Sequence, residues 1–187
     1  MGLGYHNKTM GYNICGMLTR LQSNQFIKAV KKEGSYTLNL QKNIDFEEAI
    51  SSKYDTNIID LYSTQSGTLI LTSEEFFPGI EDIAFLSDQE ELVQFMISET
   101  AMIFAFRYYK SGRLVNEDIY SYEPEFQFQG ENRLRMTSDD DIVDDGFSEL
   151  VNLFLGVNFN EIDLGEQAKR YTLELPKKGI LQFLGLK

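Results

Sequence analysis

The sequence predicts an α+β fold: a single domain in which several short helices pack against a largely antiparallel β-sheet. Three observations favour this fold. Segments with the period-two alternation of strands recur through most of the chain, short segments between them carry helix-start signals, and no internal repeat or low-complexity linker divides the sequence. With 187 residues, 42% of them hydrophobic and 13% aromatic, the chain can bury a core without a disulfide or a metal.

The N-terminal residues are interpreted separately from the domain. Because the sequence MGYNICGM at Met10 resembles a second start, residues 1–9 are expected to be a disordered extension and residues 10–187 the globular domain. The lone cysteine, Cys15, excludes an intramolecular disulfide and favours a reducing, cytoplasmic location. No apolar run approaches the roughly 18 to 20 residues of a membrane-spanning helix, so no membrane association is predicted.

Three segments carry the signals of short helices. Residues 23–34, SNQFIKAVKKEG, have a serine N-cap, an apolar face opposite three lysines, and a final glycine as a stop signal. The pairs Asp45 and Glu48, and Ser87 and Glu90, have the spacing of capping boxes, in which each side chain accepts from a backbone N–H group near the helix start. We therefore expect further helices to begin at Asp45 and at Ser87.

Strand patterns occupy much of the remaining sequence. Residues 57–73 contain two β-rich runs around a glycine-containing turn, and residues 101–123 predict a hairpin that turns at its central KSGR. Residues 101–106 are apolar on both faces, which is typical of a strand covered on both sides and places Phe104 and Phe106 in the core. Shorter alternating segments are SYTLNL at 35–40, PEFQFQG at 124–130 with Phe126 and Phe128 facing inward, and YTLEL at 171–175.

Charge is unevenly distributed along the chain. Residues 54–168 carry 24 acidic and five basic residues, a net charge of −19, whereas residues 1–53 carry +3 and residues 169–187 carry +4. The resulting field repels nucleic-acid phosphates and anionic lipids, and it accelerates encounter with basic molecules. Nucleic-acid binding is therefore not predicted, and a basic protein is the expected partner.

The densest acidic segment, TSDDDIVDDGFSEL at residues 137–150, leads into an apolar run whose helical spacing ends at Gly156. Three interpretations stay open: solvated carboxylates at a helix N-terminus, an acidic recognition surface, or an irregular calcium site. The spacing does not fit an EF-hand, because Val143 and Asn152 occupy loop positions three and twelve, so two of the required oxygen ligands are missing. No tight metal site and no cofactor are predicted.

The leading functional prediction is a non-enzymatic, acidic protein-binding module that recognises a basic partner. In charge and size, though in no motif, it is comparable to small inhibitor or immunity proteins that neutralise cationic toxins. The candidate partner-binding side chains are Asp139, Asp140, Asp141, Asp144, Asp145 and Glu149.

The alternative prediction is an enzyme or small-ligand-binding protein that uses carboxylates and tyrosines in a pocket on the sheet. Glu74 and Glu75 lie beside aromatic residues, whose burial of a carboxyl group can prepare it for general acid catalysis, and Glu99 precedes the apolar strand. The same glutamates can equally be solvated residues of loops. A broad acidic face would favour the binding module, whereas a concave pocket with a desolvated carboxylate would favour this alternative.

Sequence motifs give no support to the main motif-bearing enzyme classes. The chain has one histidine, His6, and one cysteine, and it contains no P-loop, dinucleotide-binding, serine-hydrolase or zinc-protease motif. The sequence therefore favours a protein that is not an enzyme, while the enzyme alternative described above stays open, and it makes no prediction of the oligomeric state.

Overall fold

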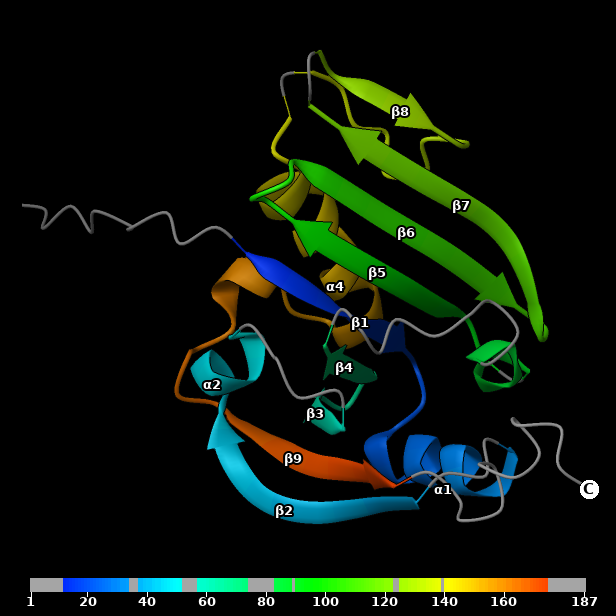
Figure 1. Ribbon diagram of the computed structural model, residues 1–187, viewed down its shortest axis with the longest axis vertical. Coiled ribbons are helices and arrows are strands. Elements are labelled where there is room, and N and C mark those ends of the chain that lie inside the picture. The colour runs from blue at the N-terminus through cyan, green and yellow to red at the C-terminus, as the bar shows by residue number, and fades with distance from the viewer. Residues whose placement is uncertain are drawn as a thin grey trace, which may run out of the picture.

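The computed structural model describes residues 12–33, 37–51, 57–73, 83–88, 90–122, 125–138 and 140–174. Within these residues the strands form one sheet whose neighbouring pairs are all antiparallel. Figure 1 shows the strong twist of this sheet. The predicted α+β class is confirmed. In sheet order the strands are β2 (Thr37–Asp45), β9 (Gln167–Glu174), β3 (Ile58–Ser63), β4 (Thr68–Thr72), β1 (Asn13–Thr19), β5 (Leu92–Ser98), β6 (Ile103–Lys110), β7 (Arg113–Ser121) and β8 (Gln127–Gln129).

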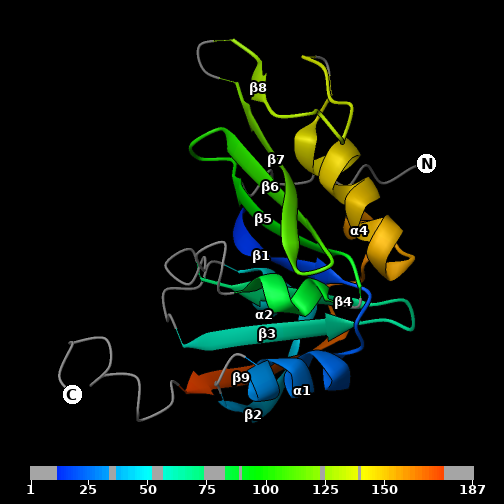
Figure 2. The same ribbon diagram turned by 90° about the vertical axis from the view of Figure 1, so that its right-hand side faces the viewer.

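Short helices cover both faces of the sheet. Figure 2 shows the longest helix of one face, and the segment that leads into it, lying along one side of the strands. One face packs against α2 (Phe46–Ile50), the π-helix η3 (Ile142–Phe147), α4 (Ser148–Leu155) and the 3-10 turn η4 (Phe159–Glu161). The other face packs against α1 (Ser23–Glu33) and the 3-10 turn η2 (Ala84–Ser87).

The middle strands form the centre of the core because side chains cover them from both sides. Every residue of β4 is buried. At Gly16 of β1 a side chain would overlap the backbone carbonyl of Ile70 in β4, so only glycine permits this close approach. On the α4 side, the rings of Phe95 and Phe147 lie 4.7 Å apart and join the sheet to the helical layer.

Helix α1 confirms the prediction for residues 23–34 with a shift at its start. The carbonyl of Gln22 accepts from the N–H of Phe26 at 2.9 Å, so Gln22, rather than the predicted Ser23, is the N-cap. The side chain of Gln25 accepts from the N–H of Gln22 at 2.8 Å, which is the reciprocal half of a capping box. Gly34 lies outside the described residues.

Helix α2 begins after Asp45 as predicted, but its capping box does not form. Asp45 instead accepts from the side chain of Gln167 at 2.9 Å. Glu48 accepts from Lys42 at 3.0 Å and from Arg170 at 2.6 Å. Both carboxylates therefore connect the helix to neighbouring strands, because the antiparallel pairing of β2 with β9 brings stronger partners within reach.

The predicted helix at Ser87 is wrong. Ser87 ends η2, its hydroxyl accepts from the N–H of Gly112 at 3.1 Å, and the segment that follows forms the strand β5 between β1 and β6. The capping-box spacing is a local signal. The run Leu92–Ser98 is rich in β-branched and aromatic residues, and pairing on both edges with burial on both faces outweighs that local signal.

The predicted hairpin is confirmed as β6 and β7. Ser111 and Gly112 at its turn both have positive φ angles, 51° and 70°, as a type I′ turn requires. Phe104 and Phe106 are buried as expected, with 4% and 0% of their surfaces exposed. The two runs within residues 57–73 are likewise strands, β3 and β4, and the described residues of the runs at 35–40 and 171–175 belong to β2 and β9.

The segment after this hairpin is less buried than its alternation predicts. Phe126 is partly buried, and its ring lies 5.3 Å from that of Tyr122. Phe128 is 51% exposed, so its predicted inward orientation is wrong. It lies in β8, a three-residue strand at the edge of the sheet that, among the described strands, pairs with β7 alone.

Candidate functional site

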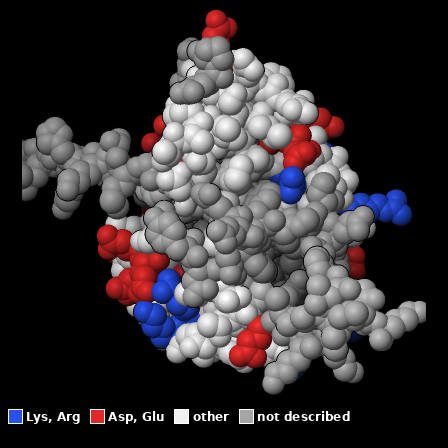
Figure 3. All heavy atoms as spheres, in the orientation of Figure 1, with Lys and Arg blue, Asp and Glu red and all other residues white. Residues whose placement is uncertain are grey.

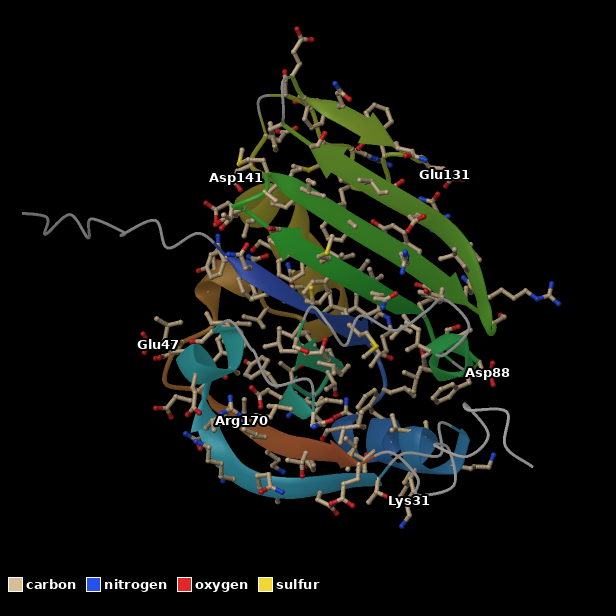
Figure 4. The ribbon with its side chains drawn as sticks, in the orientation of Figure 1. Lys31, Glu47, Asp88, Glu131, Asp141 and Arg170 are labelled. Carbon is tan, nitrogen blue, oxygen red and sulfur yellow. The ribbon has the colours of Figure 1, made fainter. Side chains whose placement is uncertain are left out.

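The acidic segment forms the start of the helical unit that runs from η3 into α4, and Figure 4 labels Asp141 at this start. Asp141 is the N-cap of η3, where its carboxylate accepts from the N–H groups of Val143 and Asp144 at 2.8 and 3.0 Å. Asp145 accepts in return from the N–H of Asp141 at 2.9 Å. Two of the predicted partner-binding acids therefore also stabilise the start of the helix.

A third acid of this segment is held by the preceding turn. The carboxylate of Asp140 accepts from both the N–H and the hydroxyl of Thr137, at 2.7 and 2.8 Å. The hydroxyl of Tyr122 donates to the backbone carbonyl of Asp140 at 2.5 Å, which ties the turn to β7. Asp139 lies outside the described residues.

Asp144 and Glu149 are exposed and do not cap the helix. Partial burial, and then the neighbouring carboxylates of Asp141 and Asp145, raise the pKa of Asp144. The acids thus repel one another where they gather. They line a hollow of about 430 Å³, named here the acidic hollow, together with one arginine: Asp140, Asp144, Asp145, Glu149, Glu161 and Arg135.

The arrangement of these carboxylates does not resemble a metal centre. Among the residues that the structure describes, no group of three or more Asp, Glu, His or Cys side chains is placed to hold a metal ion. Asp140, Asp141 and Asp145 instead accept hydrogen bonds from backbone N–H groups.

The acidic hollow lies on the α4 side of the sheet, because its residues come from η3, α4, η4 and the segment before them. Figure 3 shows the opposite face, whose upper part carries few charged side chains, whereas acidic and basic side chains gather at its lower left edge.

Part of that lower edge is a structural cluster of charges. Arg170, labelled in Figure 4 on β9, donates from two nitrogens to the fully buried carboxylate of Asp60, at 2.9 and 2.8 Å. Its third nitrogen donates to Glu48 at 2.6 Å. Because the charges of Arg170 and Asp60 satisfy each other inside the sheet, this cluster holds β3 to β9.

The glutamates of the alternative pocket are not brought together in the described structure. Glu74 and Glu75 lie outside the described residues. Glu99 accepts a hydrogen bond from the backbone N–H of Tyr12, directly before β1, and burial together with this carboxylate raises the pKa of the Tyr12 hydroxyl. Glu99 therefore has a structural partner at the end of the strand.

A larger concavity of about 960 Å³ lies beside the acidic hollow, between strands β5, β6 and β7 and the exposed side of α4. Sequence reasoning did not find it. We call it the groove. The lining residues that matter for its chemistry are Tyr108, Val115, Arg133, Leu134, Arg135 and Leu153, and Leu134, Arg135 and Glu149 line both concavities.

A buried carboxylate builds the loop that carries the arginines of the groove. Asp118 in β7 is fully buried and accepts from the backbone N–H groups of Glu131 and Asn132 and, through its other oxygen, of Arg133, at 2.7 to 3.1 Å. Asn132 and Arg135 have positive φ angles, 51° and 57°, which such a tight loop requires. The loop is therefore fixed by the sheet beneath it.

The fixed loop places Arg133 over Tyr108. The guanidinium carbon lies 5.0 Å from the centre of the Tyr108 ring, a cation–π distance. The Tyr108 hydroxyl is buried and has no hydrogen-bond partner among the described residues. Burial, and next the charge of Asp118, raise the pKa of this hydroxyl, so it remains a protonated donor at neutral pH.

One sequence signal could have indicated this loop. Asn116, Asp118 and Tyr120 share one face of β7, and Tyr120 is fully buried, so the period of the strand places a carboxylate and an amide on a core-facing side. A buried Asp needs several donors, and the glycine and asparagine at residues 130 and 132 are suited to a loop that supplies them.

Comparison of the chain with protein-family models, curated proteins and solved structures gives no match. In the described part of the chain, no helix has the length and apolar character needed to cross a membrane.

Proposed function

We propose that this protein is a non-catalytic binding module whose acidic hollow receives basic side chains of a partner protein. One observation carries the proposal: five carboxylates and a single arginine line one concavity beside α4. A concave site can surround a lysine or arginine side chain, whereas a flat acidic surface contacts only its tip.

Electrostatic repulsion within the hollow supports the proposal. The raised pKa of Asp144 reflects partial burial and the neighbouring Asp141 and Asp145, so each added cation relieves an unfavourable interaction. Hydrogen bonds between a carboxylate and an ammonium or guanidinium group are charge-assisted and roughly twice as strong as neutral ones. A basic group therefore gains more here than at an isolated surface carboxylate.

The position of the hollow within the charge distribution also supports a basic partner. It lies in the part of the chain, residues 54–168, that carries a net charge of −19. Such a field raises the rate at which a basic protein encounters the surface. Four of the acids predicted from the sequence, Asp140, Asp144, Asp145 and Glu149, line the hollow together with Glu161, whereas Asp141 caps η3 and is not part of this lining. Asp139 and Asp141 remain proposed parts of the surrounding acidic surface. A cytoplasmic location remains part of the proposal, on the basis of the lone cysteine.

Capture from a cell extract at low salt tests the proposal when two charge-matched variants are compared. Asp144→Asn/Asp145→Asn/Glu149→Gln removes three charges from the hollow. The control, Glu47→Gln/Glu131→Gln/Asp163→Asn, removes three exposed charges that do not line it. A basic protein should be retained by the wild type and by the control variant and lost from the hollow variant. Equal loss from both variants would contradict a specific site.

The alternative, a small-ligand-binding protein, is favoured by a different observation. The groove contains Tyr108, whose buried hydroxyl has no partner among the described residues, and a cation fixed above its ring. This site is independent of the acidic hollow in its chemistry, although the two are adjacent.

A further inference from the structure

We infer that the groove is a binding site for a small organic anion with an apolar body. The inference goes beyond the proposed partner surface, because it assigns a different ligand to a different concavity. It rests on three features: the donors at one end of the groove, the apolar residues on its two walls, and the rigidity of the loop that carries the donors.

The donors suit an acidic head group. The guanidinium of Arg133 is held over the Tyr108 ring, and its Nε donates to the exposed carboxylate of Glu131 at 3.1 Å, which leaves the terminal nitrogens of its planar fork to face a ligand. Tyr108 also lines the groove, and its buried hydroxyl is a donor that has no hydrogen-bond partner among the described residues. Arg135 adds a second positive charge to the lining.

The walls suit an apolar body. Leu153 on α4 is 58% exposed and Val115 on β7 is 46% exposed, and both line the groove, one from the helix and the other from the sheet. Leu134 of the fixed loop is partly buried and also lines it. Exposed aliphatic side chains on the helix and the sheet offer an apolar ligand contacts that they do not make in the unliganded protein.

The loop presents these groups without further ordering. Three backbone N–H groups of residues 131–133 are bound to the buried carboxylate of Asp118, and the amide of Asn132 exchanges hydrogen bonds with the backbone of Met136 at 2.9 and 3.0 Å. A ligand therefore meets a site that is already formed, and it loses little affinity to loop ordering.

Charge within the groove favours an anion over a cation. Of the two glutamates in the lining, Glu91 is paired with Lys110 at 2.8 Å. Glu149 and Arg135 also line the acidic hollow, and Arg133 is paired with Glu131 outside the lining. The groove lining itself carries Lys110, Arg133 and Arg135 against Glu91 and Glu149, a net charge of +1, which favours an anion.

Decanoate is a suitable probe, because it combines a carboxylate with an unbranched apolar chain. The full-length protein, labelled at its Leu and Val methyl groups, is titrated below the concentration at which decanoate forms micelles, and binding is followed by NMR and calorimetry. The methyl signals of Val115, Leu134 and Leu153 should shift. Decyltrimethylammonium, which has the same chain with a cation, and acetate, which has the head group alone, should both bind more weakly.

Two variants and two matched controls test the assigned donors. Arg133→Met should weaken decanoate binding by about tenfold or more, whereas Arg113→Met, at an exposed arginine of β7 that does not line the groove, should not. Tyr108→Phe should weaken binding by about two- to tenfold without lowering the Tm, because its hydroxyl has no bond to lose in the free protein. Tyr62→Phe should lower the Tm and leave decanoate binding unchanged, because the Tyr62 hydroxyl donates to Glu166 at 2.7 Å and does not line the groove.

Several results would overturn the inference. If decyltrimethylammonium bound with the same affinity as decanoate, the arginines would not recognise the head group. If the methyl signals of Val115, Leu134 and Leu153 did not shift, decanoate would bind outside the groove. Unchanged affinity in both Arg133→Met and Tyr108→Phe, with each variant folded, would show that neither residue is a donor. The salt dependence of binding distinguishes this site from the proposed partner surface. Added salt should weaken the binding of a basic protein, because it screens the attraction to a chain with a net charge of −12. It should not weaken the binding of decanoate in the same way, because the net charge repels this anion.

Discussion

Phe104 and Asp118 are buried residues of the same hairpin, and they stabilise it in different ways. Phe104 in β6 contributes apolar area, and its ring meets that of Tyr122 edge-on at 6.2 Å. Asp118 in β7 contributes an acceptor for the backbone of the loop at residues 131–133. Removal of the first leaves a cavity, whereas removal of the second leaves polar groups without a partner.

Phe104→Ala should lower the free energy of unfolding by about 3 to 5 kcal/mol, through lost burial and the cavity that remains. Chemical denaturation measures this change. The neighbouring Ile103 is 39% exposed and is the natural control, so Ile103→Ala should cost much less. A loss below about 1 kcal/mol for Phe104→Ala would mean that β6 is not a central strand.

Asp118→Ala should destabilise the protein by roughly 3 kcal/mol or more, because three backbone N–H groups lose their acceptor in a buried site. Glu117→Ala is the matched control. Glu117 is the adjacent carboxylate, and its ion pair with Arg107 at 2.6 Å is partly exposed, so its loss should cost about 1 kcal/mol or less. Similar costs for the two variants would show that Asp118 does not hold the loop.

These two residues also show what the sequence could predict. Phe104 belongs to a run that is apolar on both faces, and that pattern alone indicates a covered strand. The role of Asp118 depends on a loop more than ten residues further along the chain folding back over β7. The period of β7 marks Asp118 as a core-facing carboxylate that needs donors, but it does not show which later segment folds back to supply them, so the groove that depends on this return was not predicted.

At the scale of elements, η3 and α4 show how neighbouring acids differ in their effect on one helix. Asp141 caps the helix start through two backbone N–H groups. Asp144, three residues later, has no such role, and its pKa is raised by partial burial and the nearby carboxylates. The first acid should therefore stabilise the helix as a carboxylate, whereas the charge of the second should oppose folding.

The stabilities of Asp144→Asn and Asp141→Ala should change in opposite directions at neutral pH. A raised pKa means that the folded state binds the Asp144 proton more tightly, so this contribution to stability is present below the ordinary value of 3.8 and is lost as pH rises through the raised pKa. At pH values above that window, Asp144→Asn should thus have a higher Tm than the wild type. Asp141→Ala should cost about 1 kcal/mol through loss of the cap.

Thermal unfolding of the three proteins across the acid range checks this prediction. The advantage of Asp144→Asn should shrink as pH falls and the wild-type carboxyl becomes protonated. An advantage that is independent of pH, or a lower Tm for Asp144→Asn at neutral pH, would contradict the assigned repulsion.

Prediction of the elements succeeded where local and tertiary preferences agreed. The hairpin at residues 103–121 has strand-forming residues and a suitable turn, and it formed as expected. At Ser87 the local capping pattern favoured a helix, but the following run is paired with β1 and β6. The competing preference came from strands distant in sequence, which local spacing does not report.

At the scale of the whole molecule, charged side chains gather at particular places on the two faces of the sheet. The helical layer beside α4 carries the acidic hollow, and the opposite face carries few charges over its upper part (Figure 3). The net charge of −12 sets the long-range field, and the hollow sets where a basic partner should dock. The long-range field should affect the association rate of the partner, and the contacts in the hollow should affect its dissociation rate. The two effects can be separated, because salt screens chiefly the long-range field.

The most direct test of the acidic surface is the association rate of the captured partner, measured by stopped flow at low and moderate salt. The wild type is compared with a variant in which Asp139, Asp140, Asp141, Asp144 and Asp145 are all neutralised. The wild-type on-rate should fall markedly as the Debye length shortens from about 30 Å at 0.01 M to about 10 Å at 0.1 M. The variant should associate slowly at both salts while remaining folded. An on-rate that changes neither with salt nor with the five substitutions would contradict a role of the acidic surface in partner binding.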